Sequence, residues 1–204
     1  MNFRLASFVC ALAALVSGCQ STSLRSAWFD TSFAGPPMRK IMVAGAFQSL
    51  AEGRVFEDIF VEKLRAAGVD GVASHTVLLD PAKATDAAFD AAVIGSGAQG
   101  LLLVNVLGVD TRTQVSTSMA PGGMAWGRGP WGGPSTTALI PVQRVSQYDL
   151  ATVETKLFDV KTRRVVWAGT TTTLNPQTAA RETPAFADIV IGELKARGIV
   201  AGKP

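Results

Sequence analysis

Residues 40–47 read KIMVAGAF, and residues 52–67 follow as EGRVFEDIFVEKLRAA. The first segment is apolar without interruption at its centre, which is typical of a strand covered on both faces of its sheet. The second has apolar side chains at helical spacing and is followed by Gly68, a residue type that often ends a helix in the left-handed conformation. The apolar residues of that face are Val55, Phe56, Ile59, Phe60 and Leu64. Together the two segments predict the first strand and helix of an α/β domain.

The chain downstream repeats this alternation. Residues 72–78 predict a second strand, and a second helix is expected to start after the N-cap candidate Thr85 and to end at Gly97. Residues 101–106 are again strongly apolar and predict a third strand. Two consecutive strand-helix-strand units predict parallel strands that are joined by right-handed crossovers.

The C-terminal part has a different pattern. Residues 147–159 alternate between apolar and polar side chains, and residues 164–173 are expected to return beside them as an antiparallel hairpin. A final helix is predicted with Thr183 as its N-cap and Pro184 at its first position. The fold class is therefore α/β (α+β mixed), with the order βαβαβ, an antiparallel hairpin and a C-terminal helix, forming a mixed sheet covered by helices.

The N-terminal residues have the pattern of a secretory signal peptide. Arg4 precedes an apolar run that is too short to cross a bilayer as a helix and that ends in small residues. The final five residues of this region, Leu-Val-Ser-Gly-Cys ending at Cys19, resemble the lipobox of bacterial lipoproteins. An ordinary buried helix is the alternative, but its pattern would be amphipathic, whereas this run is apolar on all sides.

The lipobox resemblance implies removal of a signal peptide, residues 1–18, by cleavage between Gly18 and Cys19. Cys19 would then carry diacylglycerol through a thioether and a further acyl chain, such as palmitate, on its amino group. Several acyl chains on one residue hold a protein firmly on a membrane. In such lipoproteins an aspartate after the cysteine favours the inner membrane, and here that residue is Gln20. The expected location is the outer membrane, facing the periplasm.

Residues 19–38 are rich in Ser, Thr, Gly and Pro and predict a lipidated N-terminus and tether, which leads to a single domain over residues 39–200. Three aromatic residues, Trp28, Phe29 and Phe33, interrupt this segment. They are expected to pack the end of the tether onto the domain, with contact to a partner as the alternative.

Charge and cysteine content exclude several classes of function. The net charge of +3 is small and the basic residues do not cluster, so nucleic acid is not an expected partner. The chain has two cysteines, of which Cys10 lies in the signal peptide and Cys19 is assigned to the lipid. No thiol is left for a disulfide, a metal site or a nucleophile, and no cofactor or metal is expected.

Two short motifs give the domain a family resemblance. Residues 96–100, SGAQG, lead into the third strand, and residues 157–162, LFDVKT, precede a strand with Val166 and Trp167. These motifs resemble the body of envelope lipoproteins related to the curli secretion lipoprotein and to the N-terminal domain of the Tol-system propeller protein. In that family the first motif ends in aspartate and the second turn contains glycine, where this chain has Gln99 and Arg163. The resemblance implies the fold rather than an activity.

The candidate catalytic and nucleotide motifs have simpler structural interpretations. Gly95, Gly97 and Gly100 spell G-x-G-x-x-G, but they follow a helix and precede a strand, the reverse of a dinucleotide site. The chain has a single histidine, His75, and no G-x-S-x-G motif that would supply a nucleophilic serine for it to activate. His75 is therefore expected to be structural. Carboxylates on the first helix alternate with basic residues and predict a solvated face. They are Glu52, Glu57, Asp58 and Glu62. The chain is therefore not expected to be an enzyme.

Residues 119–135 form an unusually long segment dominated by Gly, Pro and Ala. Long loops without secondary structure in compact domains tend to be functional or disordered. The loop carries four candidates for partner binding, because Trp and Arg are enriched at interaction hot spots. These are Met124, Trp126, Arg128 and Trp131. The alternative is a disordered loop whose tryptophans fold back onto the domain.

These observations favour a non-enzymatic adaptor or assembly factor that binds an envelope protein through the loop and the neighbouring sheet edge. One alternative follows from the curli-type resemblance: a subunit of an oligomeric outer-membrane secretion pore, with residues 109–118 as one strand of a membrane hairpin. A small periplasmic hydrolase is the third possibility. The sequence leaves the partner and the oligomeric state open.

Overall fold

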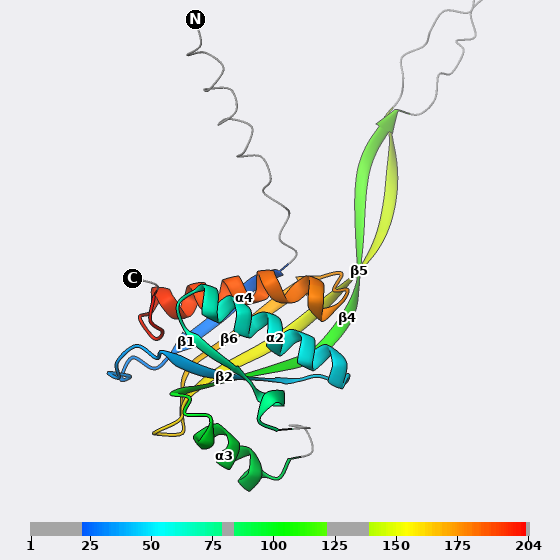
Figure 1. Cartoon of the computed structure of the whole chain (residues 1–204). Helices are drawn as coiled ribbons and strands as arrows, with labels where there is room; N and C mark the ends of the chain where they lie inside the picture. Colours follow the sequence, from blue (N-terminus) through cyan, green and yellow to red (C-terminus); the bar gives the residue numbers. More distant parts are fainter. Residues whose placement is uncertain (1–21, 79–83, 122–138, 203–204) are drawn as a thin grey trace, which may run out of the picture.

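The computed structural model describes residues 22–78, 84–121 and 139–202. Its centre is a six-stranded mixed sheet in the order β1-β6-β5-β4-β2-β3 (Figure 1). The strands are β1 (Thr22–Phe29), β2 (Lys40–Ala46), β3 (Asp70–Ala73), β4 (Gly100–Pro121), β5 (Leu139–Asp159) and β6 (Arg164–Leu174). The helices are α2 (Leu50–Ala66), α3 (Asp86–Gly95) and α4 (Ala179–Ala196), with a short 3-10 turn, η1 (Ser74–Thr76). The predicted mixed α/β class is confirmed.

The strand pairing follows the two patterns seen in the sequence. β2 pairs in parallel with both β3 and β4, as two strand-helix-strand units require. β4, β5, β6 and β1 pair in antiparallel fashion. β2 lies inside the sheet and its residues 41–43 are fully buried, which explains the uninterrupted apolar run.

Helices α2 and α4 lie side by side over one face of the sheet, and α3 lies at the other face (Figure 1). The main core lies beneath α2 and α4, with Trp167, Phe60 and Leu194 among its fully buried side chains. Phe56 stacks at ring-centroid distances of 5.7 Å on both Phe60 and Phe186, which joins the two helices. Each such side chain stabilises the fold by about 1.5–3 kcal/mol through burial.

The start of α4 differs from the prediction. The N-cap is Thr178, and both Thr183 and Pro184 lie inside the helix. The Thr183 hydroxyl donates to the carbonyl of Ala179 at 2.6 Å instead of capping a helix end. Pro184 is early enough in the helix to leave only one backbone carbonyl, that of Ala180, without its helical donor. Helix α3, in contrast, starts at its predicted N-cap Thr85.

The segment expected to be a tether contains a strand. β1 covers the outer edge of β6, with Thr22 opposite Thr173 and Phe29 opposite Trp167. Phe29 packs against the core, where the Arg197 guanidinium lies 4.3 Å from its ring centroid, while Trp28 is 55% exposed. The burial of Thr22–Phe29 does not alternate regularly and its register shifts between Leu24 and Ser26, so the sequence pattern did not predict this strand, which pairs with the edge of β6.

The turn between β5 and β6 contains the second of the two sequence motifs. Arg163 occupies the position where the family has glycine and adopts φ 57°, in the left-handed region. In the first motif, Gln99 Oε1 accepts from the backbone N–H of Arg39 at 2.6 Å. The two positions at which the chain departs from the resembled motifs therefore lie in a turn and directly before a strand.

Substituting Arg163→Gly is expected to stabilise the protein by about 0.5–1 kcal/mol, because glycine adopts positive φ without the cost of about 1–2 kcal/mol that other residues bear. The lost ion pair of Arg163 with Asp90 is exposed, so its removal costs little. Urea denaturation measures the change. Lys161→Gly in the same turn is the control, since its backbone has no positive φ and the substitution brings no such relief; equal effects for both substitutions would contradict the assignment of strain to Arg163.

Candidate functional site

The most distinctive feature of the structure is the length of the β4–β5 hairpin. The sequence predicted a strand at residues 101–106, a loop over residues 119–135 and a further strand from residue 147. In the structure β4 and β5 stay paired as far as Pro121 and Leu139. β2 accompanies β4 only as far as Asn105, and β6 accompanies β5 only from Leu150. Beyond these points the two strands leave the body together (Figure 1). We call the pairs from Thr111↔Asp149 to Pro121↔Leu139 the free ribbon.

Among the described residues, no third strand pairs with the free ribbon. At about 3.3 Å per residue the ribbon is roughly 35 Å long. Each of its outer edges presents backbone N–H and C=O groups that are not paired within the sheet, and such edges are templates for pairing with further strands. A two-stranded ribbon by itself is only marginally stable in water. Its length is therefore typical of an element that gains partners in an assembly.

The register gives the ribbon two chemically different faces. Val115 and Val145 lie opposite each other and are 59% and 62% exposed. Because side chains alternate along a strand, the pairs two residues away share their face. Apart from the Thr111↔Asp149 pair at the base, this face carries no charged side chain, and we call that part the uncharged face. It consists of Thr113, Val115, Thr117, Met119, Pro141, Gln143, Val145 and Gln147. The opposite face carries the cations Arg112 and Arg144 among serine, glutamine, valine and tyrosine side chains.

The ribbon is fixed to the body at its base. Asn175, which adopts φ 47°, donates its backbone N–H to the Asp149 carbonyl at 2.7 Å and accepts from the Asp149 N–H through its side chain at 3.0 Å. Asp149 also accepts from the Thr111 hydroxyl at 2.7 Å. A β-bulge between Val106 and Gly108 bends β4 just before this point. These contacts define where the sheet ends and the free ribbon begins.

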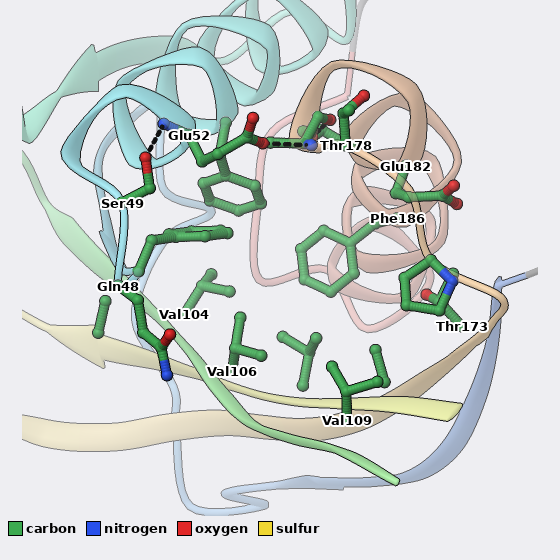
Figure 2. A pocket seen from close by; sticks show the side chains of 18 of the residues that line it. Gln48, Ser49, Glu52, Val104, Val106, Val109, Thr173, Thr178, Glu182 and Phe186 are labelled. Carbon is green, nitrogen blue, oxygen red and sulfur yellow. Dashed lines mark hydrogen bonds between the residues drawn. The ribbon is translucent and has the colours of Figure 1, made fainter. Parts of the chain in front are cut away.

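A cavity of about 700 Å³ lies beside the base of the ribbon, between the first turns of α2 and α4 and the sheet (Figure 2). We call it the base cavity. Its walls are largely apolar and come from β4, β5, aromatic residues of the two helices and the segment between β2 and α2. They include Phe47, Phe56, Val104, Val106, Leu107, Val109, Ala151, Val153 and Phe186. Figure 2 shows Val104, Val106 and Val109 in a row along β4, with the Phe186 ring facing them across the cavity.

Polar groups lie at the edge of the base cavity. Glu52 accepts from the backbone N–H of Ala179 at 2.6 Å, so a carboxylate of α2 caps the first turn of α4 (Figure 2). The helix dipole adds to this contact, since a negative charge is favoured at a helix N-terminus. Ser49 accepts from the Glu52 N–H at 3.4 Å, as the N-cap of α2. Glu52 therefore holds together the two helices that form the upper wall of the cavity.

The predicted solvated face of α2 is wrong for Glu57, which is 2% exposed. Glu57 Oε1 accepts from the Gly45 N–H at 3.0 Å and the Ser74 hydroxyl at 2.7 Å, and Oε2 accepts from the His75 N–H at 3.0 Å. The second predicted strand accordingly ends at Ala73, because residues 74–76 turn to meet this carboxylate. Asp58 and Glu62 are exposed, as predicted.

The His75 side chain belongs to the same cluster. Its Nδ1 lies 2.9 Å from Glu57 Oε2 and its Nε2 lies 3.3 Å from Asp58 Oδ1. Ser74 is fully buried and donates to Glu57 rather than to the imidazole, so it is not arranged as a nucleophile beside a base. The cluster ties α2 to the ends of β2 and β3, which is a structural role.

The sites predicted from the sequence fall in other parts of the chain. Gly18, Cys19, Met124, Trp126, Arg128 and Trp131 all lie outside the described residues. Within residues 22–78, 84–121 and 139–202, no group of three or more His, Cys, Asp or Glu residues is placed to hold a metal ion. In the same ranges no helix is long and apolar enough to cross a membrane. Among the described residues, the free ribbon and the base cavity are the candidate functional features.

Comparison with known proteins gives structural matches only. No protein-family model and no curated protein matches the chain. A PelC dodecamer from Paraburkholderia phytofirmans is 17% identical with a TM-score of 0.44, over 88% of this chain and 99% of the matched chain. The lipoprotein GNA1162 from Neisseria meningitidis is 11% identical with a TM-score of 0.40, over 77% of this chain and 98% of the matched chain. Similarity at this level assigns the chain to no family.

Proposed function

We propose that this protein is a non-enzymatic, lipid-anchored subunit of an assembly in the bacterial envelope, and that the free ribbon joins the subunits. The single observation that carries the proposal is the ribbon itself, whose edges are unpaired in the described structure from Thr111 to Pro121 and from Leu139 to Asp149. The anchor is the lipid expected on Cys19, with the body in the periplasm at the outer membrane. The proposal refines the adaptor hypothesis by placing the contact on the ribbon.

The partner best suited to a ribbon edge is another ribbon of the same length. In a second copy, β5 offers an edge with the same number of free residues and the same right-handed twist as β4. Pairing β4 of one copy with β5 of the next is a head-to-tail contact, and such contacts generate rings when the rotation closes. Closure would leave no ribbon edge unpaired, which removes the liability of an open edge.

A membrane pore is a second candidate, supported by one specific observation. Transmembrane β-strands have about 9–11 residues, and the strands of the free ribbon, residues 111–121 and 139–149, are of that length. The uncharged face is the one that lipid would contact, but threonine and glutamine side chains alternate there with valine. Conductance in planar bilayers separates the two candidates, because a lipid-anchored ring that does not span the bilayer conducts no ions.

The direct experiment is size-exclusion chromatography with light scattering on the lipidated protein extracted in detergent, followed by mild cross-linking. A discrete homo-oligomer is expected. A monomer that carries one different envelope protein would instead support the adaptor hypothesis with an unlike partner. A monomer without a partner would contradict the proposal.

Val115→Asp is expected to weaken self-association at least about tenfold, since packing the uncharged face in an assembly would require burial of the new carboxylate. The residue is 59% exposed, so the fold of the subunit should not change. Ser116→Asp, the next residue on the opposite face, is the matched control and is expected to have a much smaller effect. Sedimentation velocity at several concentrations gives both values. Equal weakening by the two variants would show that the uncharged face is not the packed one.

A further inference from the structure

The base cavity lies in one row of the sheet with the first residue of β1. Thr22 pairs with Thr173, Thr173 pairs with Ala151, and Ala151 pairs with Val109. The last three of these residues line the cavity. Thr22 is the fourth member of the row and shares its face, because its hydroxyl lies 2.9 Å from the Thr173 hydroxyl. The start of β1 is therefore one strand spacing, about 4.8 Å, from the cavity wall.

The residue expected to carry the lipid is close to this point in the chain. Cys19 precedes Thr22 by three residues, and a chain extends at most about 3.3–3.6 Å per residue. Cys19 is thus within roughly 10 Å of Thr22 in any conformation. With the strand spacing added, Cys19 lies within roughly 15 Å of Thr173 in the cavity wall, a distance that an extended acyl chain can cover.

The chemistry of the cavity suits a hydrocarbon chain. The deeper walls are formed by valine, alanine and phenylalanine side chains, including Val104, Val106 and Phe186. The polar side chains Gln48, Glu52 and Gln177 also line the site and offer donors and acceptors for glycerol and ester groups. A volume of about 700 Å³ is in the range of pockets that enclose small-molecule ligands.

We propose that the base cavity binds one acyl chain of the protein's own N-terminal lipid. This inference rests on the lipid anchor of the proposed function, but not on the pairing of ribbons. The bound chain would fill the apolar space between α2, α4 and the bulge of β4. It would fix the anchor at the base of the ribbon, so that the remaining acyl chains enter the membrane at a defined place on the body.

The test uses the full, lipidated protein with a photoreactive residue in the cavity. The variant Val109→p-benzoylphenylalanine places the probe on the cavity wall, at a side chain that is 55% exposed and so tolerates the larger group. Val115→p-benzoylphenylalanine is the matched control, since Val115 is the same residue type on the same strand and face, 59% exposed and outside the cavity lining. Gln48→p-benzoylphenylalanine, also exposed in the lining, gives a second cavity position if the first fails to fold.

After irradiation, mass spectrometry of the digested protein is expected to find the lipid-bearing N-terminal peptide joined to position 109 at least about ten times more often than to position 115. Mixing heavy- and light-isotope copies shows whether the link lies within one chain, as the proposal requires. Equal yields at both positions, a link only to bulk phospholipid, or a link to residues 122–138 of another copy would overturn the inference. The intact mass shows separately whether Cys19 carries the lipid. Measurement of self-association on the same sample tests the proposed role of the ribbon.

Discussion

Shortening the hairpin so that Arg112 and Tyr148 are joined by an Asn-Gly turn is expected to abolish self-association and to leave a folded, lipid-anchored monomer. The change removes residues 113–147, whose described side chains lie outside the core. Asn-Gly is the dipeptide that best forms a two-residue hairpin turn. The Arg112↔Tyr148 pair and the contacts among Thr111, Asp149 and Asn175 remain to close the end of the sheet.

Light scattering gives the mass of the shortened protein, and circular dichroism compares its melting temperature with that of the full chain. A melting temperature within a few degrees is expected, because few buried contacts are lost. Deletion of residues 122–133 alone is the informative comparison, since it keeps the free ribbon and removes most of the glycine-rich segment. If both variants fail to assemble, the contact is assigned to the segment with Trp126 and Trp131, in agreement with the sequence-based prediction. If the chain with the shortened hairpin still assembles, a role of the ribbon in assembly is contradicted.

The second large effect is expected for Glu57→Ala, which should lower the free energy of unfolding by about 3–5 kcal/mol, the usual cost of removing one partner from a buried, charged hydrogen-bond network. Four donors lose their acceptor together: the Gly45 N–H, the Ser74 hydroxyl, and the N–H and imidazole of His75. The loss is therefore larger than for a single hydrogen bond, which contributes about 0.5–1.5 kcal/mol.

Urea denaturation followed by tryptophan fluorescence measures this effect. Asp58→Ala is the control on the adjacent residue, which contacts the same imidazole at 3.3 Å from an exposed position, and should change stability by less than about 0.5 kcal/mol. Glu57→Gln should have an intermediate effect, because the amide keeps one acceptor oxygen. A small effect of Glu57→Ala would contradict the role assigned to this cluster.

The regular part of the fold was predictable from local pattern. The apolar run at 41–43, the helical spacing of Phe56, Phe60 and Leu64, and the glycines at helix ends all depend on residues close in sequence. Gly68 and Gly97 do adopt positive φ, at 90° and 68°. These signals fixed the order of strands and helices around the core.

The candidate site was less predictable because its signals are not local. β5 before residue 147 contains Pro141, which weakens a strand pattern, and its uncharged face alternates Val145 with glutamines rather than with aliphatic residues. The one available signal was the symmetry of Val115 and Val145 about the intervening segment, which marks them as opposite residues of one hairpin. Glu57 was misassigned because its partners Gly45 and Ser74 come from other segments, and charge alternation on a helix does not reveal them.

The row from Thr22 to Val109 also limits how far the body could lie from a membrane under the proposed lipid anchor. Only Gln20 and Ser21 lie between Cys19 and the first residue of β1. If Cys19 carries its lipid, this short connection holds that end of the body within roughly 10 Å of the headgroups. The ribbon leaves the sheet from the same end, so under the proposed lipid anchor the base of the ribbon would lie near the bilayer surface. A longer flexible insert before Thr22 would let the body move away from the membrane without altering a contact within the body. Such a variant would separate effects that depend on distance from the membrane from effects that depend on the fold.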